Sequence, residues 1–317
     1  MKNCVLTIGK FEGIHLGHKA LLAEVVHQAK KLSLRPAAVV FEPHPYIYLN
    51  DTQYKPMFTN KERDYLLTNA GIEHIFYCPF DRNLAQMSPQ DFCKKIFAEY
   101  NAKLVIVGEN YRFGKARAGD VELLRSQALI YSAQVQTIAA VASAPLTREN
   151  VSESGSIFAR LNGFWEESVS TSNIRSLISE NNIADANKLL GFPFFVSGIA
   201  AKGRQLGRTI GFPTLNIYPP DQKFLPPDGV YATNATVNGT TYRGITNIGL
   251  RPTVDNNSVA RSVETHLPEY EVTDLYSAHV KVELLNFIRP ERKFSSLEEL
   301  KTQIAKDIEK TLDSQIV

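Results

Sequence analysis

The hydrophobic pattern of this chain changes character near residue 190, and this change constrains the fold more than any single motif. Before it, short apolar runs alternate with segments whose apolar residues recur every three or four positions, as strands and helices do. Beyond it, short apolar runs follow one another, separated by turn residues. A chain of 317 residues is long enough for two cores. We therefore predict two domains, residues 1–185 and 186–317.

The first half is predicted to be an α/β domain. Its strand-like runs are Cys4–Gly9, Ala37–Phe41, His74–Phe80, Leu104–Gly108 and Val135–Val141. Helical patterns lie between them, including Ser88–Tyr100, where Ser88 suits the N-cap and Pro89 the first helical position. Another helix is predicted over Ile174–Leu190, ending at Gly191. Such alternation implies a parallel sheet with helices on both faces, a Rossmann-like fold whose ligands bind at the carboxyl ends of the strands.

The second half is predicted to be a small antiparallel β-barrel with a terminal helix. Val230–Val237 and Thr240–Ile245 flank Asn238-Gly239, which is a strong signal for a type I′ hairpin. His279–Ile288 alternates apolar and polar residues, as a half-buried strand does. Ser296-Leu297-Glu298-Glu299 has the capping-box pattern that opens a helix. Many short strands closed by one helix favour a barrel of this kind.

Composition and charge exclude several classes of protein. Hydrophobic residues make up 44% of the chain and charged residues 21%, with a net charge of +2, so the excess of positive charge typical of nucleic-acid and membrane-surface binders is missing. Cys4, Cys78 and Cys93 show neither a disulfide framework nor Cys-x-x-Cys spacing. There is no signal-peptide layout and no run of about 18 apolar residues. We expect a cytoplasmic protein with no nucleic-acid or membrane partner, a monomer or a weak homo-oligomer.

The stretch Gly207–Asn216 is the most suggestive part of the second half. It is a glycine-rich turn running into a short strand, on which Thr214 and Asn216 stand two apart and so face the same side. Hydroxyl and amide oxygens suit Mg²⁺, and bare backbone amides bind phosphates. The glycines are not followed by the Lys-Ser or Lys-Thr pair of a P-loop. Composition alone favours a hairpin corner with structural glycines over a nucleotide–metal site.

A pair of histidines, His15 and His18, flanks Gly17 at the point where the first strand gives way to a helix. Backbone amides at a helix N-terminus favour anions, and imidazoles there can donate hydrogen bonds to phosphate oxygens. A bare pair would usually be one capping and one solvated histidine. A metal pair is disfavoured, because no further ligand stands nearby at a suitable spacing.

A third candidate is the segment Ser170-Thr171-Ser172, followed by Arg175. The hydroxyls precede an amphipathic segment, so they suit an N-cap, and together with the arginine they could hold a pyrophosphate. Taken alone, the segment would be read as an ordinary capped helix with a solvated arginine.

These motifs, in this order, resemble the bacterial bifunctional riboflavin kinase/FAD synthetases, whose first domain carries a His-x-Gly-His signature. The first-half matches are Ile8–His18, Phe41–Pro45, Val107–Asp120 and Val169–Arg175. The second-half matches are Gly198–Gly203, Gly207–Asn216, Asp228–Tyr231, Asn247–Gly249 with Arg251–Thr253, Val263–His266 and Arg289–Leu300. The resemblance covers nearly the whole chain.

The resemblance implies two transfers: ATP-dependent phosphorylation of riboflavin to FMN in the second domain, and adenylylation of FMN to FAD and pyrophosphate in the first. The implied partners are riboflavin, FMN and ATP, with Mg²⁺ carried by Thr214 and Asn216. The implied catalytic residues are Glu264 as base and His15, His18 and Arg175 on the polyphosphate. The implied flavin-binding residues are Arg289 and Glu291. The implied ATP-binding residues are Gly9, Phe11, Gly17, His44, Asn110, Ser170, Thr171, Gly203, Gly207, Arg208, Thr214 and Asn216.

Two residues depart from the pattern of that family. Lys10 and Glu12 stand where it most often has a neutral residue and Asp. This leaves a second hypothesis, a riboflavin kinase whose first domain transfers adenylyl groups weakly. A third is a flavin- or nucleotide-sensing regulator, against which the intact Thr214, Asn216 and Glu264 speak.

Overall fold

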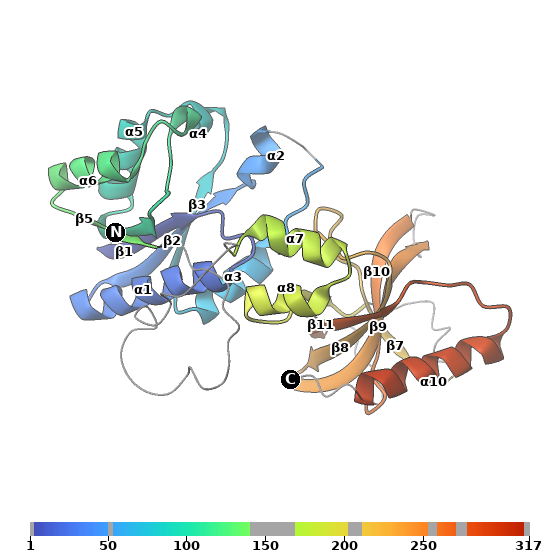
Figure 1. Ribbon diagram of the computed structural model, residues 1–317. Coiled ribbons are helices and arrows are strands. Elements are labelled where there is room, and N and C mark those ends of the chain that lie inside the picture. The colour runs from blue at the N-terminus through green and yellow to red at the C-terminus, as the bar shows by residue number, and fades with distance from the viewer. Residues whose placement is uncertain are drawn as a thin grey trace. The chain divides into compact units, whose positions relative to one another are not determined.

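The computed structural model describes residues 3–49, 53–139, 169–201, 211–252, 259–270 and 278–313. The chain divides into two compact units, Met1–Thr171 and Ser172–Val317, coloured blue to green and yellow to red in Figure 1. The predicted boundary between residues 185 and 186 stays a prediction.

The first unit is built on a five-stranded parallel sheet in the order β3-β2-β1-β4-β5. Its strands are β1 (Cys4–Gly9), β2 (Arg35–Glu42), β3 (His74–Pro79), β4 (Ala102–Gly108) and β5 (Gln134–Ile138). Its α-helices are α1 (Leu16–Leu32), α2 (Pro45–Leu49), α3 (Asn60–Asn69), α4 (Arg82–Gln86), α5 (Pro89–Lys94) and α6 (Val121–Ile130). The predicted Rossmann-like α/β fold is confirmed.

Helices cover both faces of this sheet, and successive residues of β1 point to opposite faces, so they belong to two different cores. Leu6 packs in one core with Phe92 of α5 and Leu124 of α6. Val5 packs in the other core with Leu22 of α1 and Leu67 of α3. The strand order changes direction at β1, so the carboxyl ends of β1 and β4 face the crevice where ligands of such sheets bind.

Two predicted helices differ from the structure. Ser88 does cap α5, with its Oγ accepting a hydrogen bond from Asp91 N at 3.0 Å, but the helix continues as a π-helical turn over Lys95–Glu99. The single helix predicted over Ile174–Leu190 is wrong, because it is split into α7 (Thr171–Ser179) and α8 (Ile183–Leu190).

Asparagines explain the break between α7 and α8. Asn181 has a φ of 63°, a left-handed conformation that asparagine tolerates better than most residues. Asn182 then caps α8, its side chain accepting from Asp185 N. The end of α8 was predicted correctly, since Gly191 terminates it with a φ of 71°.

The second unit is a curled antiparallel sheet of six strands in the order β6-β11-β8-β9-β10-β7. The strands are β6 (Phe195–Ile199), β7 (Thr214–Ile217), β8 (Gly229–Val237), β9 (Thr240–Pro252), β10 (Val259–His266) and β11 (His279–Arg289). Asn238 and Gly239 both have positive φ, which confirms the type I′ hairpin. The two ends of the sheet meet where Ala201 N donates to Asn216 O at 2.8 Å, so the sheet curls toward the predicted barrel.

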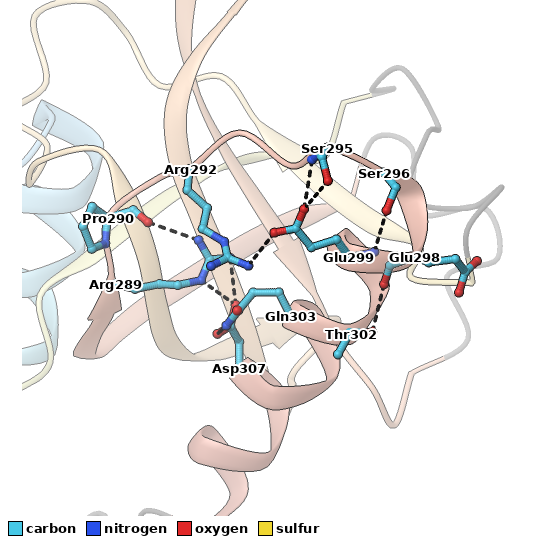
Figure 2. Close-up of polar contacts among 10 residues, drawn as sticks. All are labelled: Arg289, Pro290, Arg292, Ser295, Ser296, Glu298, Glu299, Thr302, Gln303 and Asp307. Atoms are coloured by element: carbon cyan, nitrogen blue, oxygen red, sulfur yellow. Dashed lines mark hydrogen bonds and ion pairs between the residues drawn. The ribbon is translucent and has the colours of Figure 1, made fainter.

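The terminal helix α10 (Leu297–Asp313) is fixed by polar contacts at its start (Figure 2). Ser296 Oγ accepts from Glu299 N at 3.2 Å, as predicted. The Glu299 carboxylate returns to Ser295 N at 2.9 Å instead of to Ser296 N, so the capping box is offset by one residue. Further along, Asp307 accepts from Arg289 Nε at 2.9 Å and from Gln303 Nε2 at 2.7 Å. These contacts tie the helix to the end of β11.

Removing the Asp307 carboxylate is expected to destabilise the second unit. Its side chain is 1% exposed and that of Arg289 is 18% exposed, so Asp307→Ala leaves a guanidinium largely buried without its partner. We expect a loss of about 3 kcal/mol in the free energy of unfolding, measured by urea denaturation followed by circular dichroism. Glu298→Ala, on the exposed face of the same helix, is the matched control and should change it by less than about 0.5 kcal/mol. Equal effects of the two variants would contradict this role of Asp307.

Candidate functional site

The first candidate site is the histidine pair at the start of α1. His15 is the N-cap residue and His18 lies in the first turn. Their rings stack, with centroids 4.1 Å apart and planes at 22°. A Cβ on Gly17 would lie 3.2 Å from the His15 ring, so glycine leaves the room that the stack needs. Among the described residues, the Nδ1 atoms of both histidines are shielded from solvent and have no hydrogen-bond partner.

Both histidines are neutral at pH 7. Burial lowers the pKa of His15 to about 4. Burial, and then the nearness of His15, lower the pKa of His18 to about 3. A neutral imidazole still donates one hydrogen bond, and the helix N-terminus beside it offers free backbone N–H groups. This arrangement can receive the oxygens of a phosphate without a buried positive charge.

The pKa values of this pair make the stability of the first unit depend on pH. They lie below the ordinary value of 6.5, so below pH 6.5 the unfolded chain binds more protons than the folded one. The stability is therefore complete above about pH 6.5 and is expected to fall as the pH is lowered toward 4. We expect the unfolding temperature, measured by calorimetry, to fall between pH 7.5 and pH 5. The fall should be smaller for the His15→Asn/His18→Asn variant than for the unsubstituted chain. Parallel losses would contradict the assignment.

The loop before the histidines is tightly folded. Phe11 has a φ of 45° and Ile14 a φ of 43°, conformations that are strained for residues with side chains. The Phe11 ring lies 5.2 Å from the His18 ring and 3.0 Å from where a Cβ on Gly9 would stand. A Cβ on Gly13 would lie 3.6 Å from Thr171 Oγ1. The structure thus brings Gly9, Phe11, Gly17 and Thr171 around the histidine pair.

Glu12 joins this loop to His44. Its side chain is 4% exposed, and its Oε2 lies 3.4 Å from His44 Nε2. Glu12 also accepts hydrogen bonds from Tyr54 Oη at 2.5 Å and Met57 N at 3.3 Å. Because His44 Nδ1 accepts from Tyr46 N at 3.3 Å, the imidazole proton lies on Nε2, on the side of Glu12. Sequence reasoning missed this network, since its partners stand more than thirty positions apart along the chain.

A cavity of about 610 Å³ opens at the carboxyl ends of the strands. Gly9 at the end of β1 and Lys10 after it, with Asn110 and Arg112 after β4, contribute to its lining. The predicted residue Asn110 therefore lies in this cavity. Ser170 is half-buried immediately before α7.

Arg175 lies in the second unit, whereas the histidines lie in the first. It is on α7, and its guanidinium carbon is 4.3 Å from the Phe224 ring centroid. This distance corresponds to a cation–π contact.

The second candidate site is centred on Glu264 of β10. In the sheet, Glu264 pairs with Asn216 of β7 on one side and with Asn247 of β9 on the other. Two positions along, His266 pairs with Thr214, and period-two alternation places all five side chains on one face. Ser262 Oγ donates to Glu264 Oε1 at 3.3 Å. The result is a half-buried carboxylate between two amides.

A cavity of about 400 Å³ brings together most of the residues predicted for this site. Its lining includes Thr214, Glu264, Arg289 and Glu291, whereas Asn216 is buried beside it. The hydroxyl of Thr214 and the amide of Asn216 are oxygen donors that fit a hard cation such as Mg²⁺. The predicted Gly203, Gly207 and Arg208 lie outside the described residues.

Three lining residues were not assigned a role from the sequence. Asn247 Nδ2 donates to Glu291 Oε1 at 2.8 Å, and the Glu291 carboxylate lies against Gly249, where any Cβ would collide with it. His266 Nδ1 lies 2.8 Å from Pro213 O, which fixes the turn before Thr214. Asp307 holds Arg289, as described above. Only the strand register reveals that Asn247 and Glu264 are neighbours.

The two sites define a class of protein. An α/β unit with a neutral histidine pair at a helix N-terminus, and a curled β unit with a carboxylate beside oxygen donors, together indicate a two-domain nucleotide-dependent transferase.

Comparison with known proteins identifies the family. Residues 1–154 match the family model FAD synthetase, and residues 190–315 match the family model Riboflavin kinase. The bifunctional riboflavin kinase/FMN adenylyltransferase of Escherichia coli K12 is 34% identical over 309 residues, 96% of this chain and 91% of that protein. The Bacillus subtilis 168 protein of the same description is 30% identical over 306 residues, 96% and 90% of the two chains. This chain belongs to the bifunctional riboflavin kinase/FMN adenylyltransferase family, and both catalytic domains of that family are present.

A solved structure supports the fold. A Streptococcus pneumoniae protein described as a macrolide-efflux protein superposes with a TM-score of 0.80 at 27% identity, covering 98% of this chain and 94% of that one. In the part of this chain that the structure describes, no helix is long and apolar enough to cross a membrane.

Proposed function

We propose that this chain makes FMN and FAD in two steps, with the kinase reaction at the Glu264 site and the adenylyl transfer at the His15–His18 site. The observation that supports this division is that the stacked histidine pair lies at the start of α1 in the first unit, whereas Glu264 lies beside Asn216 on a sheet face of the second. Family membership with both domains favours this function over a kinase with an idle first domain and over a sensor.

In the kinase reaction, Glu264 accepts the proton of the primary hydroxyl of riboflavin while the hydroxyl oxygen attacks the γ-phosphorus of ATP. The bond between that phosphorus and the ADP oxygen breaks, giving FMN and ADP. Asn216 and Asn247 flank Glu264 in the sheet, one on each side, and Ser262 Oγ donates to its carboxylate. Mg²⁺, bound by Thr214 and Asn216 together with the nucleotide, would neutralise charge on the phosphate oxygens.

Arg289 and Glu291 are proposed to contact the flavin. Both line the cavity that contains Glu264, and both have fixed positions, Arg289 through Asp307 and Glu291 through Asn247. Side chains held in this way lose little conformational freedom when a ligand binds, so they orient it at low entropic cost.

In the adenylyl transfer, an oxygen of the FMN phosphate attacks the α-phosphorus of a second ATP, and pyrophosphate leaves. A phosphate monoester is already anionic, so the step needs no general base. His15 and His18 donate hydrogen bonds to the polyphosphate, where negative charge accumulates in the transition state. Ser170 and Thr171 are proposed to hold the leaving pyrophosphate, and the same role for Arg175, which lies in the second unit, stays a prediction.

The product assay tests this function. The chain is incubated with riboflavin, ATP and Mg²⁺, and flavins are resolved by chromatography. We expect FMN first and FAD later, with neither formed when a chelator removes the divalent cation. FMN without FAD would favour the kinase-only hypothesis, and neither product would favour a sensor.

The proposed setting is the cytoplasm, where riboflavin, FMN and ATP are the partners and the chain works as a monomer or a weak homo-oligomer. Three free, buried thiols, Cys4, Cys78 and Cys93, suit a reducing compartment.

A further inference from the structure

Three cations line the cavity of the first unit at the carboxyl ends of its strands: Lys10, Arg112 and Arg117. They come from two loops, one after β1 and one after β4. No carboxylate stands among the described residues that line this cavity. An excess of positive charge inside a cavity favours an anionic ligand.

The charges of these three residues are not equally compensated. Arg112 Nη1 is 3.0 Å from Asp120 Oδ2, which offsets its charge. Burial lowers the pKa of Lys10, Glu12 opposes this, and the nearness of Arg117 lowers the pKa further. The Glu12 carboxylate thus attracts the Lys10 ammonium, and Arg117 repels it more weakly. An anion between Lys10 and Arg117 would relieve this repulsion.

An aromatic stack holds Lys10 in place. Its Nζ lies 5.0 Å from the Tyr46 ring centroid, within the range of a cation–π contact. Tyr46 stacks on Tyr54 at 5.1 Å, and Tyr54 Oη donates to the buried Glu12 at 2.5 Å. Glu12 thus fixes Tyr54, and through the two rings it fixes the surface on which the ammonium rests.

Arg117 is presented by a strained turn. Ala116 and Arg117 have φ angles of 53° and 59°, so two consecutive residues with side chains adopt the left-handed conformation. The turn is closed by two hydrogen bonds between Phe113 and Gly119, at 3.0 and 2.9 Å. The loop is thereby held in a shape that keeps Arg117 in the cavity lining.

The remainder of the cavity suits a flat aromatic ring. Its lining includes the aromatic residues Phe41, Tyr46, Phe80, Phe92, Tyr111 and Phe113. Aromatic walls offer stacking and edge contacts to a planar heterocycle. Aromatic walls, together with cations in a lining that contains no carboxylate among the described residues, match a planar ligand that bears a phosphate monoester.

We propose that Lys10 and Arg117 bind the phosphate monoester of the flavin and so make the first unit select FMN over riboflavin. The inference rests on the proposed adenylyl transfer and adds its specificity determinant. The dianionic phosphate bridges the two cations, which offsets their repulsion and also the repulsion between this phosphate and the incoming ATP. Riboflavin, which carries no phosphate, would gain neither of these two contacts.

The test distinguishes binding of the flavin phosphate from binding of the flavin ring. Lys10→Met and Arg117→Gln are compared with the unsubstituted chain for the KM of FMN in FAD formation. In parallel, 5′-deoxyriboflavin, which cannot be phosphorylated, is used as a competitor, and its inhibition constant reports on the ring site. Each variant should raise the KM for FMN about 10- to 100-fold and leave that inhibition constant within about twofold. Lys61→Met, an exposed lysine of α3, is the matched control and should change neither.

An unchanged KM for FMN would overturn the inference. So would equal rises in the KM and in the inhibition constant, since these would show that the cations shape the whole cavity. If the unsubstituted chain formed no FAD, the proposed adenylyl transfer would fail, and fluorescence titration with FMN would decide the inference without turnover. There the variants should weaken FMN binding and spare 5′-deoxyriboflavin, and equal weakening would overturn the inference.

Discussion

Replacing Glu264 by glutamine is expected to slow the formation of FMN from riboflavin by roughly 10²- to 10⁴-fold, the usual contribution of a positioned general base. Glutamine keeps the shape of the side chain and one acceptor oxygen, but it cannot take the proton of the attacking hydroxyl. The neighbours across the sheet, Asn216 and Asn247, are neutral amides themselves, so another amide between them should be accommodated without rearrangement. The effect should therefore fall on the turnover number and spare the KM of riboflavin.

The same variant should make FAD from supplied FMN at the rate of the unsubstituted chain, because we assign that step to the other unit. Glu269→Gln, an exposed carboxylate just beyond β10, serves as the matched control and should leave both rates unchanged. If Glu264→Gln abolished both activities in a folded protein, the assignment of one reaction to each unit would be wrong.

The second large effect is expected at the histidine pair. His18→Asn should lower the rate of FAD formation from FMN by roughly 10²- to 10³-fold, as the loss of a transition-state hydrogen-bond donor does. The reason is geometric, because His18 stacks on His15 at the N-terminus of α1, and asparagine is too short to reach the same phosphate oxygen. Riboflavin phosphorylation should be unaffected.

His27→Asn is the control for this variant, since His27 is an exposed histidine on the same helix. Steady-state rates of both reactions, measured on the same preparations, give the comparison. A His18→Asn chain that made FAD at an unchanged rate would exclude His18 from the chemistry.

Much of the fold follows from local sequence. The strand Cys4–Gly9 was predicted with its observed bounds, because a short run of β-favouring residues that ends in glycine indicates both ends of a strand. The Asn238-Gly239 turn was equally clear, since few residue pairs accept two positive φ angles. The split between α7 and α8 was missed because the apolar period continues across it, and only Asn181 and Asn182 mark the break.

The candidate sites were less predictable, because they depend on contacts between distant residues. From the sequence alone, Glu12 is only a departure from the family pattern, which most often has Asp at this position. In the structure its carboxylate is bonded to Tyr54 and Met57, 42 and 45 positions away. Likewise, the neighbours of Glu264 are set by the pairing of three strands, and no local pattern reveals that pairing. The types of residue were thus predictable, and the networks that orient them were not.

A dual-label experiment tests the central claim most directly. Riboflavin is incubated with Mg²⁺ and a mixture of ATP labelled at the γ-phosphorus and ATP labelled at the α-phosphorus with a second isotope, and the purified FAD is counted for both. With an equimolar mixture of the two labelled ATPs, we expect both labels in the purified FAD in equal molar amounts, because its FMN phosphorus comes from a γ-phosphate and its AMP phosphorus from an α-phosphate. Accumulation of γ-labelled FMN with no α-label in any flavin would contradict the central claim.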